Sequence, residues 1–243
     1  MWFMERSRFF IKFKIHFCLD SISAIINFNH RVIHKKQKGK NKEAFMCSRY
    51  YFDNDTMNDI LNIVEKTDAS LQGMQVNRDI YPTDDAAVII KNAAGGIKLS
   101  KIKWGYPAIS GSGIIINARA ETALDKKMFE GGIRRRRAVI PAGFFYEWSR
   151  SKEKNIFRRK DRGTVYMAGF YDLTASGERF IIITTQANAS MIKIHDRMPL
   201  ILEKGQIKDW LLDDTAVDCL LQQTPVLLDR ETEYEQQTLF DLS

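Results

Sequence analysis

The sequence of 243 residues contains only three cysteines, Cys18, Cys47 and Cys219, and no Cys-x-x-Cys pair. It therefore offers no disulfide framework, and a reducing, cytoplasmic setting is expected. No apolar run reaches the roughly 18–20 residues that a membrane-spanning helix needs. Charges interrupt the partly apolar first 34 residues, and no small-residue cleavage site follows them. We therefore expect neither a membrane span nor a signal peptide.

Histidine is also scarce, and His195 is the only one after residue 34. The net charge of +7 comes from the first 45 residues, which hold ten Lys and Arg against three Asp and Glu; residues 46–243 hold 27 of each. Charge is segregated within this neutral part. Residues 134–162 contain eleven basic and three acidic side chains, whereas residues 209–241 contain nine acidic side chains and one Arg. Such a distribution allows a positive groove on a neutral domain.

Cys47 directly follows a methionine, and the run Met46-Cys47-Ser48-Arg49-Tyr50 is typical of the beginning of a protein. If translation began at Met46 and that methionine were removed, Cys47 would carry a free α-amine beside its thiol. The amine of such a 1,2-aminothiol condenses with an aldehyde to an imine, and the thiol closes on the imine carbon to give a thiazolidine. Neither group does this alone, so the functional prediction depends on whether Cys47 is N-terminal.

Residues 1–45 have two interpretations. Within them, residues 35–43 (KKQKGKNKE) are Lys-rich and lack core-forming side chains, which is typical of disorder. The segment is either a flexible basic tail that helps to bind DNA or the result of a wrongly assigned start codon. We favour the second interpretation, because Lys42-Glu43-Ala44 can be encoded as AAG-GAG-GCN. That codon run contains a ribosome-binding sequence shortly before an ATG at Met46.

Residues 46–243 alternate between short strand patterns and a few helical ones. Apolar residues at helical spacing predict a helix over 56–66, and further helices are expected over 121–130, 188–193 and 206–212. Strands are expected over 87–90, 98–105, 114–116, 138–140, 165–171 and 180–185. This pattern favours a single α+β domain with a curved, barrel-like, mainly antiparallel sheet flanked by a few helices. We expect its core over about 46–212 and a loosely held acidic tail after it.

Three polar side chains are candidates for catalysis. His195 lies in a polar, loop-like stretch and is the side chain best suited to proton transfer near neutral pH. Glu147 is flanked by aromatic residues, and burial there would raise the pKa of its carboxyl. The alternative is that Glu147 is the solvent-facing member of an alternating strand. Asn117 follows a buried strand, and its amide can orient a substrate hydroxyl or imine nitrogen.

Two arginines and two aromatic residues are candidates for binding a nucleic acid. Arg49 and Arg119 are suited to phosphate, as are residues 134–137, although a run of four arginines is more often a solvated face. Trp104 and Tyr106 are suited to stacking on bases, although core packing is the more common role of Trp.

Five ordered motifs in the chain resemble one family. They are Met46-Cys47-x-Arg49, Trp104-Gly105, Asn117-Ala118-Arg119-x-Glu121-Thr122, Pro141-Ala142-Gly143-Phe144-x-Tyr146-Glu147-Trp148 and Ile194-His195-Asp196-Arg197-Met198-Pro199. Together they are similar to the SOS response-associated peptidase (SRAP) family, whose members process abasic sites in single-stranded DNA.

The resemblance implies a role for each matched residue. Cys47 corresponds to an N-terminal cysteine that links covalently to the opened deoxyribose aldehyde. Asn117, Glu147 and His195 correspond to the active-site residues, and Arg49 and Arg119 to arginines that hold the DNA backbone. Ser48 stands where the family usually has Gly.

The resemblance also implies the setting of the protein. It predicts a cytoplasmic, monomeric protein of the DNA damage response, with no cofactor and no metal, whose activities extend to abasic-site lyase chemistry and self-processing peptidase activity.

Two other functions use some of the same residues. The first is an N-terminal-nucleophile cysteine peptidase or hydrolase, with Cys47 attacking an amide and His195 acting as base. The second is a non-catalytic module that binds single-stranded DNA and needs the arginines and aromatic residues but not Cys47.

Overall fold

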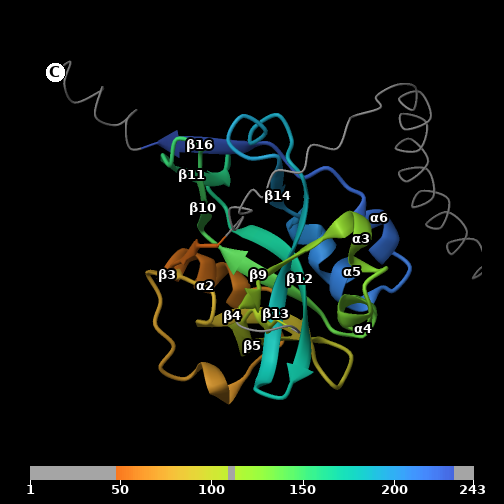
Figure 1. The fold of residues 1–243 in the computed structure, drawn as a ribbon. Coiled ribbons are helices and arrows are strands. Elements are labelled where there is room, and N and C mark those ends of the chain that lie inside the picture. Colours follow the sequence, from red (N-terminus) through yellow and green to blue (C-terminus); the bar gives the residue numbers. More distant parts are fainter. Residues whose placement is uncertain (1–47, 109–112, 233–243) are drawn as a thin grey trace, which may run out of the picture. The chain divides into compact units, whose positions relative to one another are not determined.

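The computed structural model describes residues 48–108 and 113–232 of the chain, so the interpretations of residues 1–45 fall outside the described residues. Strands dominate the described part (Figure 1). They are β1 (Tyr50–Phe52), β2 (Lys66–Thr67), β3 (Arg78–Ile80), β4 (Asp85–Lys91), β5 (Ile97–Trp104), β6 (Tyr106–Pro107), β7 (Ile114–Ile115), β8 (Asn117–Arg119), β9 (Arg137–Ala142), β10 (Phe144–Trp148), β11 (Lys154–Arg159), β12 (Val165–Thr174), β13 (Gly177–Gln186), β14 (Arg197–Pro199), β15 (Ile201–Leu202) and β16 (Leu228–Thr232).

The helices of the described part are short. They are α2 (Asn54–Leu61), α3 (Ala120–Ala123), α4 (Lys127–Arg135), α5 (Ile207–Leu212) and α6 (Val217–Leu221), with single 3-10 turns η1 (Ala69–Leu71) and η2 (Lys204–Gln206). None of these helices is both long and apolar enough to cross a membrane. Figure 1 shows α3, α4, α5 and α6 gathered on one side of the central strands.

Five strands form a closed ring at the centre of the fold. The hydrogen-bonded order is β13-β12-β9-β4-β5, and β5 pairs again with β13 where Trp104 lies opposite Phe180. The neighbouring pairs along this order are antiparallel, and the closing pair is parallel. The expectation of an α+β fold with a barrel-like, mainly antiparallel sheet is confirmed.

The β12–β13 hairpin opens at one end, and a later segment of the chain fills the gap. Leu200 lies between the two strands: its N–H donates to the carbonyl of Ile183 (2.9 Å), and its carbonyl accepts from the N–H of Ala168 (2.7 Å). β14 therefore pairs with β13, and β15 pairs with β12. β8 pairs with the same end of β13, at Ile182, Ile183 and Thr184. The end of β13 thus carries β8 and β14 as its two neighbours.

A second sheet of five strands, in the order β16-β11-β10-β1-β3, shares the core of the ring. Side chains of β1 and of the first part of β11 alternate between a buried face and a partly exposed face. On the buried face, the ring of Tyr50 (β1) lies 5.4 Å from that of Trp104 (β5), centroid to centroid. This contact joins the second sheet to the ring.

The helices pack where the sequence gives them an apolar face. In α4, Phe129, Gly132 and Ile133 are buried. A Cβ at Gly132 would lie 2.5 Å from a ring carbon of Phe170 on β12, so the absence of a side chain allows this close approach. Asp53 caps the start of α2: its carboxylate accepts from the N–H of Thr56 (2.8 Å) and so satisfies one of the amides left without a partner at the helix start.

Three sequence-based expectations need correction. Residues 121–130 do not form one helix but contribute to α3 and α4. Residues 188–193 form turns, because Asn188 accepts from the N–H and hydroxyl of Ser190 while its amide donates to the carbonyls of Pro225 and Val226. The fold also continues past residue 212, since α6 and β16 bury apolar side chains and β16 pairs with β11.

Candidate active site

Two of the predicted site segments flank the end of β13. Asn117 and Arg119 belong to β8, in which Asn117 lies opposite Ile182 and Arg119 opposite Thr184. His195 precedes β14, whose Arg197 lies opposite Gln186. β13 therefore brings two motifs, about 75 residues apart in the sequence, to the same end of the ring. Arg119 is exposed and Asn117 is half-buried.

The loop that contains His195 places two polar groups beside Nδ1 of its ring. Its Nδ1 accepts from the backbone N–H of Arg197 at 3.0 Å and also lies 3.0 Å from a carboxylate oxygen of Asp196. A neutral ring that accepts at Nδ1 has no proton there to donate, so the two contacts are alternatives. Burial of the ring lowers the pKa of His195 below its ordinary value, opposed by the Asp196 carboxylate and helped by Arg197. The neutral form with its proton on Nε2 is therefore favoured.

Glu147 lies on the buried face of β10. Its side chain is 3% exposed, and its neighbour on the same face, Phe145, is fully buried. The alternative that Glu147 is the solvent-facing member of the strand is therefore wrong. The aromatic residues of the same run, Phe144, Tyr146 and Trp148, alternate to the other face, where their rings contact one another. The strand thus sends one carboxylate to its buried face, opposite the buried Asn155 of β11.

Cys47 lies outside the described residues, which begin at Ser48. The chain then enters β1, which runs antiparallel to β10. The backbone N–H of Tyr146 donates to the carbonyl of Arg49 at 3.0 Å, so Arg49 lies beside β10 one residue away from Glu147. Arg49, which the sequence places two residues after Cys47, is thus a neighbour of the motif that contains Glu147.

Arg49 is engaged within the protein. Its guanidinium donates to the carboxylate of Asp79 (Nε to Oδ2, 2.9 Å) and lies over the rings of Tyr81 and Tyr146, at 5.0 and 4.5 Å from their centroids. The hydroxyl of Tyr146 donates to the same carboxylate at 2.8 Å. Burial of the guanidinium would lower the pKa of Arg49, but the hydrogen bond that Arg49 donates to the Asp79 carboxylate raises it. A phosphate would have to share this cation with Asp79.

Trp104 and Tyr106 do not occupy positions from which a base can be reached. Trp104 is fully buried, donates from Nε1 to the carbonyl of Ile116 (3.1 Å) and stacks on Phe180. Tyr106 is 4% exposed. The expectation that these two rings stack on DNA is corrected: both are core residues.

Residues 134–137 are also not a uniform solvated face. Arg134 and Arg135 are exposed, whereas Arg136 pairs with Asp172 (2.8 Å). Arg137 is 5% exposed and donates to the carbonyls of Ile133, Arg134 and Trp210, at the ends of α4 and α5. Half of the run is therefore committed to the fold.

Sequence reasoning missed the bidentate pair between Glu121 and Arg197. Arg197 donates from Nη1 to Oε1 (2.6 Å) and from Nη2 to Oε2 (2.8 Å) of Glu121. Partial burial would raise the pKa of Glu121, but the hydrogen bonds from Arg197 hold it below its ordinary value. A signal was available, since two of the motifs each contain one of these charges.

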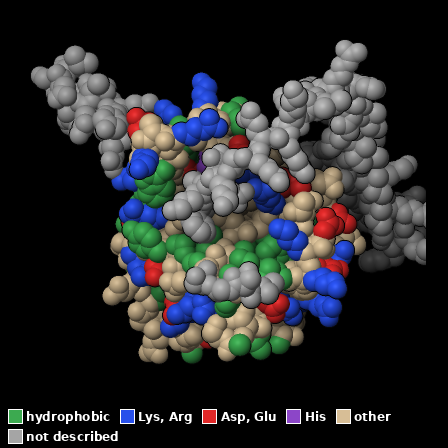
Figure 2. Space-filling view, viewed as in Figure 1, with side chains coloured by type: hydrophobic (Ala, Val, Ile, Leu, Met, Phe, Trp, Pro, Cys, Tyr) green, Lys and Arg blue, Asp and Glu red, His purple; other side chains and the backbone are tan. Residues whose placement is uncertain are grey.

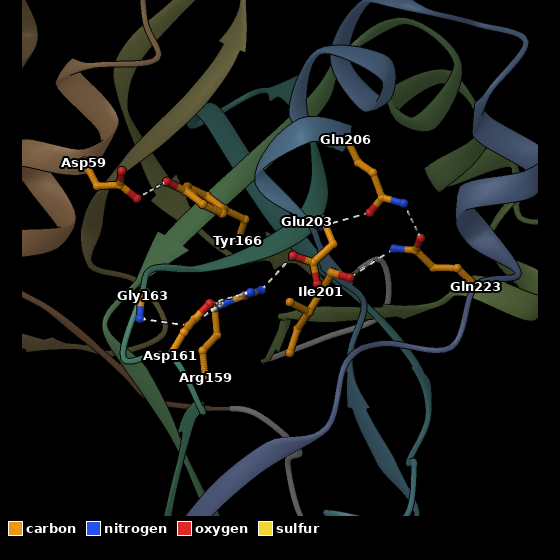
Figure 3. A network of polar contacts seen from close by, with 9 residues as sticks. All are labelled: Asp59, Arg159, Asp161, Gly163, Tyr166, Ile201, Glu203, Gln206 and Gln223. Atoms are coloured by element: carbon orange, nitrogen blue, oxygen red, sulfur yellow. Dashed lines mark hydrogen bonds and ion pairs between the residues drawn. The ribbon is translucent and has the colours of Figure 1, made fainter. Parts of the chain in front are cut away.

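A cavity of about 760 Å³ lies between α2, the β11–β12 turn and η2, and none of the predicted site residues lines it. Figure 3 shows its side chains bonded to one another: Arg159 bridges Asp161 and Glu203, and Tyr166 donates to Asp59. This network ties the segments together. Over the described ranges, no group of three or more His, Cys, Asp and Glu side chains is arranged to hold a metal ion.

Comparison with known proteins identifies the family. The model of the family described as SOS response associated peptidase (SRAP) matches residues 46–236. The chain belongs to the SRAP family. As expected from the five motifs, the SRAP match begins at the methionine that precedes Cys47.

Curated relatives of the SRAP domain carry a common name. The abasic site processing protein YoaM of Bacillus subtilis is 35% identical over 151 residues, which cover 56% of this chain and 66% of YoaM. The abasic site processing protein YedK of Escherichia coli is 28% identical over 191 residues, 70% of this chain and 82% of YedK. The matched part thus spans slightly less than two thirds of YoaM.

Solved structures share the fold. A protein from Bacteroides thetaiotaomicron superposes with a TM-score of 0.65 at 23% identity, over 76% of this chain and 91% of that one. A protein from Bordetella bronchiseptica gives a TM-score of 0.62, also at 23% identity, over 76% of this chain and 99% of that one.

Proposed function

We propose that this protein processes abasic sites in single-stranded DNA by forming a covalent thiazolidine through Cys47, with Cys47 as its N-terminal residue. The observation that carries the proposal is the SRAP match, which begins at Met46 and includes every candidate catalytic residue. Relatives named abasic site processing proteins support the substrate. The chemistry of a 1,2-aminothiol toward an aldehyde supports the reaction.

The reaction proceeds in two bond-forming steps. An abasic deoxyribose is in equilibrium with its ring-opened aldehyde. The unprotonated amine of Cys47 adds to C1′ of that aldehyde, and loss of water gives the imine. The thiolate sulfur of Cys47 then adds to the same carbon while the nitrogen takes up a proton, which closes the thiazolidine. The imine also acidifies the C2′ proton, so elimination of the 3′ phosphate, a lyase outcome, competes with closure.

The described side chains are suited to moving the protons of these steps. His195 with its proton on Nε2 donates that proton toward O4′ of the sugar as the ring opens. Glu147, buried on β10, transfers protons on the amine and the carbinolamine. The amide of Asn117 orients the reacting nitrogen. Each role needs only groups that this chain supplies.

Binding to the DNA backbone relies on positive side chains near these residues. Arg119 is exposed and follows Asn117 by two positions. Figure 2 shows Lys and Arg side chains along the upper part of the face that is turned to the viewer, where β10, β11 and β16 lie in Figure 1. Such a surface binds single strands mainly through phosphates, and its affinity falls with salt.

The test compares two forms of the protein that differ only at the N-terminus. The chain that begins at Met1 is expected to form no stable crosslink, and the chain that begins at Cys47 is expected to form one. In the longer form the nitrogen of Cys47 is an amide, whose lone pair is delocalised into the carbonyl and cannot form an imine. Its thiol adds to an aldehyde only as a reversible hemithioacetal, which does not survive denaturation.

Each form is verified by intact mass and given the same abasic oligonucleotide, and the products are separated on a denaturing gel. Equal crosslinking by an extended form that stays uncleaved would disprove the aminothiol mechanism. A model peptide serves as the second substrate, because cleavage of the peptide without crosslinking would favour the peptidase alternative. If the protein binds the oligonucleotide but neither crosslinks to it nor cleaves the peptide, the remaining alternative is a non-catalytic module that binds single-stranded DNA.

A further inference from the structure

Three side chains connect the two motifs that flank β13. Arg197, the first residue of β14, donates to both carboxylate oxygens of Glu121, which lies in the first turn of α3, directly after β8. The same guanidinium donates from Nη2 to the backbone carbonyl of Thr184 on β13, at 2.7 Å. The hydroxyl of Thr184 donates to the carbonyl of Ala118 on β8, at 3.3 Å.

These contacts fix the position of β8 relative to β14, which backbone pairing alone does not set. Among the described residues, β8 and β14 do not pair with each other, and each pairs with β13. The Glu121–Arg197 pair is therefore a direct link across β13 between the motif of Asn117 and the motif of His195. Its bidentate geometry sets both the distance and the orientation of the two segments, which a single hydrogen bond would not do.

The link reaches the His195 ring through the backbone of Arg197. The N–H of Arg197 donates to Nδ1 of His195, and this contact favours the ring with its proton on Nε2. A displacement of residue 197 that lengthens this contact would weaken the preference for the Nε2–H tautomer. Asp196, 83% exposed and beside Nδ1, would then be the remaining partner, and it would favour a proton on Nδ1.

We propose that Glu121, acting through Arg197, is a positioning residue that holds His195 in register with Asn117. The inference rests on the proposed function of this site. Glu121 itself need not touch the DNA. Its carboxylate is 41% exposed, whereas the Arg197 side chain is 12% exposed. An ion pair with one exposed member adds little to stability, so its main effect is expected on geometry.

The experiment uses the variants Glu121→Gln and Glu121→Ala in the active form of the protein. Gln keeps the length of the side chain and one acceptor oxygen, while Ala removes both acceptors. The maximal crosslinking rate at saturating abasic oligonucleotide is expected to fall about 10-fold or more in Glu121→Ala, and less in Glu121→Gln, because small misplacements of catalytic groups cost large factors in rate. The oligonucleotide concentration at half-maximal rate should stay within about 2-fold of wild type.

A matched control is Asp85→Asn, which removes an acid from the ion pair with Lys103 between β4 and β5, away from the site. It should leave the maximal rate unchanged. The second measurement is the ¹⁵N NMR signature of His195 in histidine-labelled protein, assigned by the loss of its signal in His195→Gln. At a pH where the ring is neutral, wild type should show the Nε2–H tautomer, and Glu121→Ala should show an increased share of Nδ1–H.

Each outcome has a defined meaning. A fall in maximal rate together with the tautomer shift supports the inference. An unchanged maximal crosslinking rate overturns the inference, as does an unchanged ¹⁵N NMR signature of His195. If only the oligonucleotide concentration at half-maximal rate changes, the Glu121–Arg197 pair acts in DNA binding instead. If wild type itself forms no crosslink, the proposed function fails, and the NMR comparison alone still decides whether Glu121 positions His195.

Discussion

Replacing Arg137 with alanine is expected to destabilise the fold strongly, although Arg137 belongs to a run of four arginines that looks like a surface patch. Its guanidinium donates to the carbonyls of Ile133 (3.2 Å) and Arg134 (3.0 Å) and to that of Trp210. These carbonyls lie in the last turns of α4 and α5, where no further helical N–H follows to satisfy them. One buried cation thus caps two helices and also complements their dipoles.

The magnitude follows from the number of acceptors left without their donor. A buried polar group without a partner costs about 1–3 kcal/mol. Three carbonyls would lose Arg137, and water entering the space vacated by the side chain would offset part of the loss. We therefore expect the free energy of unfolding to fall by about 3–5 kcal/mol. At about 2–4 °C per kcal/mol for a chain of this size, the Tm should fall by roughly 6–20 °C.

Equilibrium urea unfolding followed by tryptophan fluorescence measures this change. Arg135→Ala is the matched control, because it removes a neighbouring arginine that is exposed. Asp214→Ala is the second control: this carboxylate accepts from Arg137 at 2.6 Å but is 82% exposed. Both controls should cost less than about 1 kcal/mol. A loss below about 1 kcal/mol for Arg137→Ala, or equal losses for Arg135→Ala and Arg137→Ala, would refute the capping argument.

Three further predictions concern the site. Cys47→Ala should abolish the heat-stable adduct with an abasic oligonucleotide, and Cys47→Ser should leave only an imine that borohydride traps. The control Cys219→Ala should match wild type, and a full-strength adduct in Cys47→Ala would contradict the assignment of Cys47. Arg119→Ala should reduce the steepness of the plot of the logarithm of the DNA-binding constant against the logarithm of the salt concentration by about 0.7 for single strands. Arg49→Ala should reduce it by less, because Asp79 already balances that charge. If both variants keep the wild-type slope, neither arginine contacts phosphate. Because folding lowers the pKa of His195, its contribution to stability is present above pH 6.5 and is lost as the pH falls through the folded value. The stability difference between wild type and His195→Gln should therefore shrink as the pH falls below 6.5, and a pH-independent difference would contradict the burial of the neutral ring.

The ring of strands was predictable from the sequence where the chain makes local contacts. β4 and β5 form a hairpin across Asn92, whose side chain accepts from the N–H groups of Ala94 and Gly96, and both strands follow from apolar runs and turn residues. β12 and β13 likewise form a hairpin of long apolar strands. β1, β3 and β16 have no comparable signal, because they are short and gain their stability from partners far along the chain.

The candidate site was predictable only to the level of residue types. Polar side chains at strand ends and within an aromatic run pointed to Asn117, His195 and Glu147. Burial was the main source of error, because a pattern of residue types does not say which face a side chain takes. Trp104 and Arg137 illustrate both directions of this error: an aromatic residue expected at the surface lies in the core, and a cation expected at the surface caps helices inside it.

Charge pairing within the protein constrains how the proposed DNA complex forms. Arg49, Arg158 and Arg197 each form an ion pair with a carboxylate of the fold. A phosphate gains less from such a cation, because binding has to replace an existing partner rather than only release counterions from DNA. We therefore expect a modest and salt-sensitive affinity. For a reaction that ends in a covalent bond this suffices, since the encounter needs to last only until the imine forms, and permanence comes from the carbon–sulfur bond of the thiazolidine.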